Sequence, residues 1–298
     1  MDINSSTRKK LANLKSLFSK LKKGKESLLT MIGEIEVCEN VYNSNAIENS
    51  TLTLKDTEKI LLDMEISGNS SLREVYEAKN LGRIIEYVRK KEEGIFLNKE
   101  IIIFLHKMLL DNISNSIAGR FRTEGEFVRV GTHIAPPPEE INKLILDALF
   151  DYDSNSSKHI VEKVSQFHLA FENIHPFIDG NGRIGRVLIN LQLQQKGYPP
   201  IIIRDKEKKA YYNTFSEYQN LNKVKPLTTI IVGAIFESFH KRLTYLQGHK
   251  IIKLSEYSKL HGIKLNNLLN IAKRQKIPAF RERGVWKISK DFKDLVTT

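Results

Sequence analysis

Apolar residues recur at intervals of three and four along most of this chain. Between residues 8 and 43 they form two stripes, one of Leu11, Leu14, Leu17, Phe18 and Leu21 and one of Leu28, Ile32 and Ile35. Similar spacing continues through residues 54–113, 141–152, 160–174 and 230–246. These intervals place apolar side chains on one face of a helix, so the pattern predicts a mainly α fold.

One stretch in the middle of the chain has a different pattern. Residues 127–134 alternate around Gly131, and three prolines follow at residues 136–138. Alternation, a glycine and a proline terminator are typical of strands joined by a turn. We predict a short β-hairpin at about residues 122–137.

The segment after Gly248 predicts a small separate fold. Residues 254–262 and 267–275 read as two short helices, and residues 278–288 read as a hairpin. Helix, turn, helix and hairpin in this order outline a winged helix. We therefore predict three parts, namely a basic N-terminal helical segment (1–25), a central helical domain (26–248) and a winged-helix-like module (249–298).

Composition indicates an ordinary globular protein. The 298 residues are 41% hydrophobic and 28% charged. No apolar run reaches the length of a membrane span, and the polar, basic N-terminus does not resemble a secretory signal. The one cysteine, Cys38, excludes an intrachain disulfide and fits a reducing compartment. We expect a cytoplasmic protein without membrane contact.

The net charge of +12 is concentrated at the two ends. Residues 1–25 carry eight Lys or Arg against one Asp, and residues 250–298 carry twelve against four acidic residues, so the rest of the chain is slightly acidic. Basic ends can bind an acidic partner such as DNA, although solvated lysine faces are commoner. A winged helix can also dock on a protein or form a dimer, so DNA contact stays open.

The densest group of reactive side chains is the segment HPFIDGNGRIGR, which starts at His175. The GNG at residues 180–182 can form an anion-binding nest, and the helical spacing after it places this nest at a helix N-terminus. Arg183 and Arg186 lie on the first turns of that helix, where guanidinium groups can bind phosphates. Asp179 can hold Mg²⁺, and His175 can accept a proton from a hydroxyl. The segment predicts a site for a polyphosphate.

The same glycines also fit the short dinucleotide-binding pattern GxGxxG, with Asp205 twenty residues beyond Gly185 and the strand-like residues 201–203 before Asp205. That pattern requires a buried strand that leads into the glycines. Residues 167–174 instead have helical spacing, and the chain lacks the alternating strands and helices of a doubly wound sheet. We therefore reject the dinucleotide interpretation, and we expect His106 and His168 to be structural.

The twelve residues from His175 resemble the Fic-family motif HxFx(D/E)GNGRxxR, and every fixed position of that motif is matched. The resemblance implies a Fic helical bundle with a small β-hairpin flap for residues 26–248. It also implies an enzyme, a protein adenylyltransferase that moves AMP from ATP to a Ser, Thr or Tyr hydroxyl of a protein. ATP and Mg²⁺ are the expected substrate and cofactor.

The resemblance also assigns roles to individual positions. His175 is expected to deprotonate the hydroxyl, Asp179 to hold Mg²⁺, and Phe177 to anchor the loop in the core. The expected phosphate-binding residues are Gly180, Asn181, Gly182, Arg183 and Arg186, with Arg186 on the γ-phosphate. Tyr211 or Tyr212 is expected to face the adenine.

A second resemblance lies upstream, at residues 40–50. Ser44, Glu48 and Asn49 match the inhibitory motif (S/T)xxxE(G/N), ahead of the core as in class II Fic proteins. The resemblance implies that Glu48 pairs with Arg186 and competes with the γ-phosphate of ATP for that guanidinium. In an alternative role, Glu48 orients a water and the enzyme removes AMP from its target.

The expected partner is a protein that presents a hydroxyl. Its extended segment can add to the flap by main-chain hydrogen bonds, although the hairpin can equally be structural. A homodimer also fits, because many Fic proteins are inhibited by a partner subunit. The alternative outside enzymology is a DNA-binding regulator with a dormant Fic domain.

Overall fold

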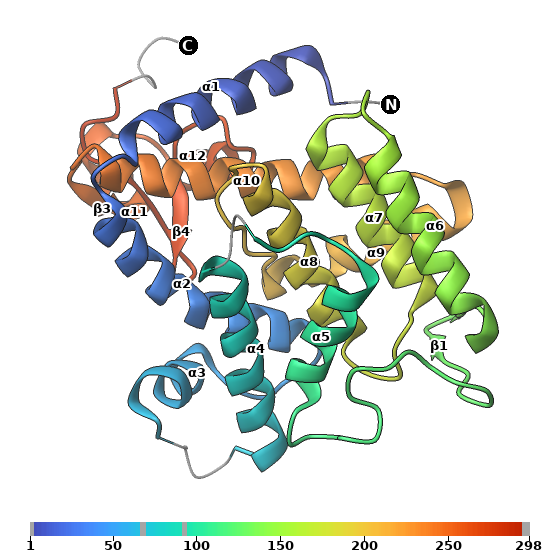
Figure 1. The fold of residues 1–298 in the computed structure, drawn as a ribbon. Coiled ribbons are helices and arrows are strands. Elements are labelled where there is room, and N and C mark those ends of the chain that lie inside the picture. Colours follow the sequence, from blue (N-terminus) through green and yellow to red (C-terminus); the bar gives the residue numbers. More distant parts are fainter. Residues whose placement is uncertain (1–2, 66–69, 91–93, 294–298) are drawn as a thin grey trace. The chain divides into compact units, whose positions relative to one another are not determined.

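The structure of this chain is a computed structural model, and it describes residues 3–65, 70–90 and 94–293. Helices dominate, as the sequence predicts (Figure 1). The chain divides into two compact units, the first made of Glu36–Lys196 with Ile202–Ile230 and the second of Ile3–Ile35, Gly197–Ile201 and Ile231–Thr298. The long helices α2 (Glu26–Ile47) and α10 (Lys225–Leu246) each contribute residues to both units, and the domain limits at residues 25 and 248 stay predictions.

The first unit holds most of the helices and the hairpin. Its remaining helices are α3 (Leu54–Glu58), the π-helix η1 (Lys59–Asp63), α4 (Leu72–Lys90), α5 (Lys99–Leu110), the 3-10 helix η2 (Pro138–Glu140), α6 (Ile141–Ser154), α7 (Ile160–Ile174), α8 (Asn181–Gln195), the 3-10 helix η3 (Asp205–Glu207) and α9 (Lys208–Leu221). In the described ranges, no helix is both long enough and apolar enough to cross a membrane.

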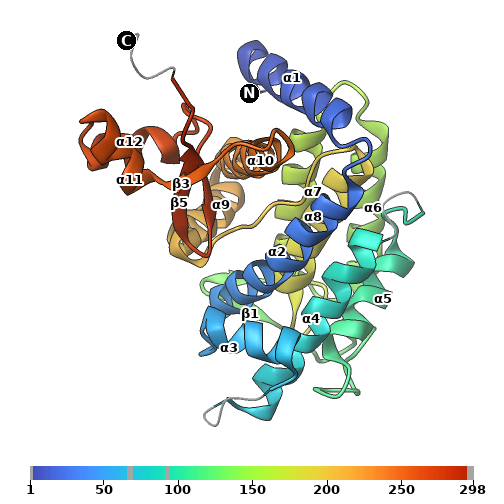
Figure 2. The ribbon, with the colours of Figure 1, turned by 90° about the vertical axis from the view of Figure 1, so that its left-hand side faces the viewer.

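Helix α8 lies at the centre of the first unit. Twelve of its fifteen residues are buried, including the polar Asn181 and the two arginines of its first turns. A helix that is buried on all sides needs neighbours on all sides. Helices α4, α5 and α7 pack against it, and Figures 1 and 2 both show them beside it. Helix α8 is therefore enclosed by other helices of the first unit.

The helix α7 leads into the glycine-rich segment, and residues 201–203 form no strand. The dinucleotide pattern requires a strand in front of the first glycine. The structure therefore contradicts a dinucleotide site.

The predicted hairpin is present but short. Strands β1 (Arg129–Val130) and β2 (His133–Ile134) pair antiparallel, with Arg129 opposite Ile134 and Val130 opposite His133. Gly131 has a φ of 61°, which a tight turn accepts most easily from glycine. The rest of the predicted flap, residues 122–128 and 135–137, is irregular.

The second unit contains α1 (Ser5–Leu21) and a small mixed fold at the C-terminus. Strand β3 (Ile251–Lys253) is followed by α11 (Leu254–His261), α12 (Leu265–Lys273), β4 (Phe280–Glu282) and β5 (Val285–Ser289). The strands form an antiparallel sheet in the order β3-β5-β4. Both predicted helices and the hairpin are present, whereas the sequence analysis missed β3. Their assignment as a winged-helix-like module stays a prediction.

Candidate active site

The site is built on the turn between α7 and α8. His175 caps the end of α7 with a φ of 49°, and its N–H donates to the carbonyl of Phe171. Pro176 follows and cannot continue the helix. Gly180 then begins α8 with a φ of 82°, a left-handed conformation that favours glycine. Two left-handed residues thus turn the chain back within five positions and bring His175 near the start of α8.

Phe177 anchors this loop, as the resemblance implies. Its ring is fully buried and stacks on His106 with centroids 3.6 Å apart. The side chain of Asn181 accepts the Phe177 N–H at 2.9 Å and donates to the Phe177 carbonyl at 2.8 Å. Asn181 was predicted to contact phosphates, but its amide is 2% exposed and already paired in both directions. In this structure its side chain fixes the loop, and its backbone N–H belongs to the first turn of α8.

His106 is structural, as predicted. Its Nδ1 accepts the N–H of Gly119 at 3.0 Å, so Nε2 carries the proton and donates to the carbonyl of Asp179, also at 3.0 Å. Burial lowers the pKa of His106 to about 4 and keeps the ring neutral. The ring therefore supports the loop through its contacts with Phe177 and Asp179 and adds no charge to the site.

His175 is held in its neutral form. Burial lowers its pKa to about 4, and the nearby Arg122 and His133 act in the same direction. The imidazole is therefore neutral at pH 7 and able to accept a proton. His133 of the hairpin also faces the end of α7, where its Nε2 lies 2.8 Å from the carbonyl of Asn173.

Arg122 joins the hairpin to the loop that contains His175. Its guanidinium is 3% exposed and donates to the carbonyls of Glu126 and Pro136 at the two ends of the hairpin. The same guanidinium donates to the carbonyls of Ile174 and His175. Burial lowers the pKa of Arg122, against a smaller opposite effect of Glu126. No pattern in the sequence marks this residue as part of the site.

Arg186 lies in the contact that the upstream motif predicts. Its Nε donates to Ser44 Oγ at 2.9 Å, and its Nη2 donates to Ser44 O and to Glu48 Oε1, both at 2.8 Å. Arg186 is 5% exposed and Glu48 34%, so the pair is partly screened by solvent. A Cβ atom on Gly182 would lie 2.3 Å from Glu48 Oε1. The Glu48 carboxylate thus occupies the space beside the first turn of α8, where an anion would bind.

The third residue of the upstream motif, Asn49, has a conformational role. Its φ is 69°, a left-handed value that Gly and Asn tolerate best. Its Oδ1 accepts Nζ of Lys208 at 2.7 Å. The requirement for Gly or Asn after the glutamate thus has a backbone cause, namely the turn that ends α2.

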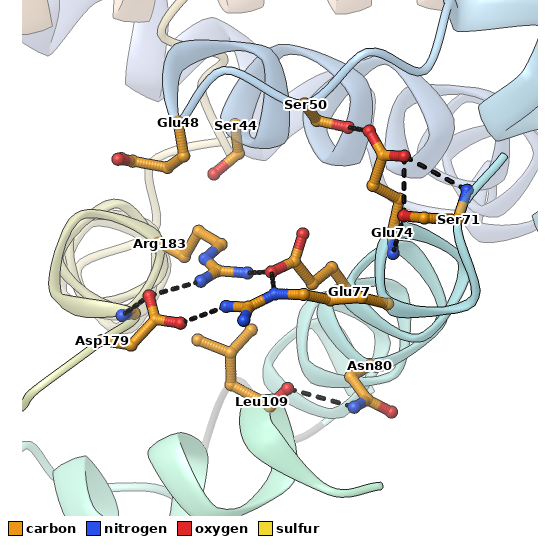
Figure 3. Close-up of polar contacts among 12 residues, drawn as sticks. Ser44, Glu48, Ser50, Ser71, Glu74, Glu77, Asn80, Leu109, Asp179 and Arg183 are labelled. Atoms are coloured by element: carbon orange, nitrogen blue, oxygen red, sulfur yellow. Dashed lines mark hydrogen bonds and ion pairs between the residues drawn. The ribbon is translucent and has the colours of Figure 1, made fainter. Parts of the chain in front are cut away.

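A second network holds Arg183 and Asp179, and Figure 3 shows Arg183 between Asp179 and Glu77. Arg183 is 4% exposed and lies 2.9 Å from Asp179 Oδ1 and 3.0 Å from Glu77 Oε1. Arg73 lies 2.6 Å from Asp179 Oδ2 and 3.1 Å from Glu77 Oε1. The sequence analysis missed Arg73 and Glu77, because an arginine and a glutamate four residues apart usually mark a solvated helix face.

The donor set suits a hard cation that phosphates help to bind. Burial alone would raise the pKa of Asp179, but Arg183 and Arg73 outweigh it and hold that pKa below its usual value. The carboxylate is therefore ionised, and 33% of its side chain is exposed. Within the described part of the chain, no three His, Cys, Asp or Glu side chains gather around one point. Mg²⁺ needs only one or two protein carboxylates when phosphates supply oxygens, so Asp179 fits.

The two tyrosines of α9 differ in access. Tyr211 is fully buried, and its hydroxyl lies 2.7 Å from Nε2 of His168. Tyr212 is 37% exposed and donates to the carbonyl of Ile47, next to Glu48. Tyr211 therefore cannot contact an adenine in this structure, and only Tyr212 keeps the predicted role. His168 belongs to the core, as predicted, and burial lowers its pKa to about 3.

Glu172 is an acid beside this cluster, and only 9% of its side chain is exposed. Its Oε1 would lie 2.4 Å from a Cβ atom on Gly185, so the glycine lets α7 and α8 approach closely here. Burial and the nearby Glu48 raise the pKa of Glu172 to about 8, against an opposite effect of Arg186. The carboxyl is therefore mostly protonated at pH 7. No sequence motif predicts a role for this residue.

Comparisons with known proteins agree with the motif. Residues 96–193 match the model of the Fic/DOC family. The chain is 33% identical over 201 residues to a protein of Nematostella vectensis named Protein adenylyltransferase Fic. That alignment covers 65% of this chain and 45% of the relative, so the chain spans less than half of the relative's length.

Solved structures show a similar fold. A Fic domain containing signaling protein from Bacteroides thetaiotaomicron superposes with a TM-score of 0.72 at 26% identity, over 80% of this chain and 97% of that chain. A Fic family protein from Desulfovibrio desulfuricans superposes with a TM-score of 0.67 at 20% identity, over 99% of this chain and 98% of that chain. The second likeness concerns the fold alone, and it extends over the C-terminal segment.

Proposed function

Because the chain carries a Fic domain, we propose that it transfers AMP from ATP to a Ser, Thr or Tyr hydroxyl of a protein. One observation carries the proposal. A neutral imidazole, His175, ends α7, and five residues later α8 begins with a glycine turn and two buried arginines, Arg183 and Arg186. A base next to an anion-binding helix N-terminus is the arrangement that hydroxyl attack on a polyphosphate requires.

In this reaction the target hydroxyl attacks the α-phosphorus. A new P–O bond forms, the bond from the α-phosphorus to the oxygen that bridges to the β-phosphate breaks, and pyrophosphate leaves with the bonding electron pair. His175 accepts the proton of the hydroxyl at its imidazole. The N–H groups at the start of α8 and the guanidinium groups of Arg183 and Arg186 hold the phosphates in position. Mg²⁺ on Asp179 supplies positive charge to the phosphates when it is bound.

We infer that Glu48 restrains this transfer. Its carboxylate pairs with the guanidinium that the γ-phosphate would use, and it lies beside Gly182 at the anion site. ATP binding in the productive orientation then requires Glu48 to leave. Both partners belong to one chain, so the restraint needs no second subunit.

The exposed hairpin supports target binding. Phe127 is 67% exposed and Ile134 72% exposed, and both belong to the segment that Arg122 joins to His175. Solvent-exposed apolar residues next to a short sheet edge suit an extended target segment that adds as a strand. We propose that the target docks there and presents its hydroxyl to His175.

The test is incubation with ATP labelled at the α-phosphate, Mg²⁺ and cell lysate. We expect label on protein with Glu48→Gly, little label with wild type and none with Glu48→Gly/His175→Ala. Label that is lost from a modified target only when Glu48 is intact would favour AMP removal instead. Absence of label in every form, with ATP bound, would refute AMP transfer.

A second function, binding of duplex DNA, rests on the exposed face of α12. Four polar or basic side chains line it, namely Asn266, Asn267, Asn270 and Lys273, and the exposed Arg274 follows at the C-terminal end of the helix. Asn suits adenine edges in the major groove, while Lys and Arg bind phosphates. We propose that this helix contacts DNA. Fluorescence anisotropy with the full chain should give salt-dependent binding that Lys273→Ala/Arg274→Ala weakens, and unchanged binding by that variant would refute the role of α12.

A further inference from the structure

The two oxygens of Asp179 have different partners. Oδ1 accepts the N–H of Gly180 at 2.6 Å and Nη2 of Arg183 at 2.9 Å, so it is bound by the start of α8. Oδ2 accepts Nη2 of Arg73 at 2.6 Å. Arg73 comes from the first turn of α4, and its side chain is 59% exposed. One oxygen is thus held by the site itself and the other by a side chain from the protein surface.

We propose that Arg73 is a built-in counter-cation of Asp179 that a divalent metal displaces. The inference rests on the proposed function, in which Asp179 holds Mg²⁺ together with the nucleotide. A guanidinium and a metal ion need the same lone pairs and repel each other, so the two cations exclude one another at Oδ2. A partly exposed ion pair is weak, which allows Arg73 to leave. Arg183 is 4% exposed and remains.

Glu77 contacts both arginines and can hold them in place while a metal replaces Arg73 at Asp179. Its Oε1 accepts Nε of Arg73 at 3.1 Å and lies 3.0 Å from Nη1 of Arg183. When Arg73 releases Asp179, it keeps Glu77 as a partner and stays at the edge of the site. Arg183 keeps the same carboxylate and its orientation toward the phosphates. Glu77 is thus a positioning residue of Arg183.

The Arg73 contact is independent of the Glu48 contact. Glu48 occupies an anion site at Arg186, whereas Arg73 occupies a cation site at Asp179. The two pairs come from different parts of the chain, because Glu48 lies in the turn after α2 and Arg73 lies on α4, the helix that also carries Glu77 (Figure 3). Removal of Glu48 therefore frees the position of a phosphate but leaves the metal in competition with Arg73.

The test measures metal binding directly. Mn²⁺, whose free ion gives an EPR signal, is titrated into the Glu48→Gly protein with a non-hydrolysable ATP analogue, with and without Arg73→Gln. Glutamine keeps a polar, unbranched side chain but is shorter than arginine, so it removes both the charge and the Nη2 atom that contacts Asp179. Arg83→Gln is the matched control, because Arg83 lies on the same helix, is 61% exposed and pairs with Asp111 at 3.4 Å. We expect Arg73→Gln to lower the half-saturating Mn²⁺ concentration about two- to fivefold, the range for an exposed pair, and Arg83→Gln to leave it unchanged.

Coincident titrations of all three proteins would overturn the inference, as would a higher half-saturating concentration with Arg73→Gln. Binding of the nucleotide analogue and AMP transfer by the Glu48→Gly protein are measured alongside. If the protein binds the nucleotide analogue and transfers AMP while the three Mn²⁺ titrations coincide, only the role proposed for Arg73 is refuted. If none of the three proteins binds the nucleotide analogue, both the proposed function and the inference about Arg73 are refuted.

Discussion

Replacement of Glu48 by glycine tests the restraint on the phosphate site. Glu48→Gly removes one charge-assisted hydrogen bond to Arg186 and empties the space beside Gly182. A hydrogen bond to a charged group contributes about 1.5–3 kcal/mol, and the 34% exposure of Glu48 reduces this to about 1–2 kcal/mol. ATP then no longer has to displace a carboxylate. We expect ATP to bind about 5- to 30-fold more tightly.

Isothermal titration calorimetry with ATP and Mg²⁺ measures this difference, and AMP transfer should rise with it. Glu48→Gln is an intermediate case, because its neutral amide oxygen can still accept from Arg186 but does not carry charge. Glu34→Gln is the control, since Glu34 is an exposed carboxylate on helix α2, which ends just before Glu48. It removes one negative charge without touching Arg186 and should leave the ATP affinity at the wild-type value.

Equal affinities of wild type and Glu48→Gly would refute the competition between carboxylate and phosphate. An equal rise in Glu34→Gln and Glu48→Gln would show a general effect of charge on ATP binding. In either case the Glu48–Arg186 pair would be a structural contact of α2 and not a restraint.

Three further predictions concern the loop and Glu172. His175→Ala should lower AMP transfer at least about 100-fold while ATP binding stays nearly unchanged. Because burial lowers the pKa of His175 to about 4, the kcat/KM of the Glu48→Gly protein for AMP transfer should be retained at pH 5.5. A loss of kcat/KM centred near pH 6.5 would contradict this. Asn181→Ala leaves the N–H and carbonyl of Phe177 unpaired, so thermal or urea unfolding should show a loss of about 2–4 kcal/mol, and a loss below about 1 kcal/mol would contradict the anchoring role. The raised pKa of Glu172, about 8 against 4.5, means that the folded protein binds this proton more tightly; the resulting stability is complete below pH 4.5 and is lost as the pH rises through 8. The free energy of unfolding of wild type should therefore fall by about 1.5 kcal/mol more between pH 6.5 and pH 8 than that of Glu172→Gln, and parallel curves would contradict it.

The loop could be predicted from the sequence because the residues that shape it are close to one another along the chain. The His175-Pro176 break, the glycine at position 180 and the arginines of α8 lie within twelve consecutive residues, so local rules describe them. The contact between Glu48 and Arg186 joins residues 138 positions apart, and spacing alone could not predict it. It was predicted from the resemblance to a family motif.

Other features depend on packing that the sequence does not encode locally. Arg73 and Glu77 have the spacing of a solvated helix face, yet α4 packs on α8 and turns them toward Asp179. Asn181 has the right chemistry for phosphate, but the loop uses its amide to pair both backbone groups of Phe177. Strand β3 has only three residues, too few for a period to appear.

The hydrogen bonds of Arg122 would limit which hydroxyl of a docked target reaches His175. One planar guanidinium binds the carbonyls of Glu126 and Pro136 on the hairpin and of Ile174 and His175 on the loop. Because a guanidinium is rigid, these bonds hold the hairpin at a fixed separation from the backbone of His175. If a target docks on the hairpin as proposed, its strand would advance about 3.3 Å per residue past His175. The modified hydroxyl would then be selected by its position along the target strand and not by the side chains around it.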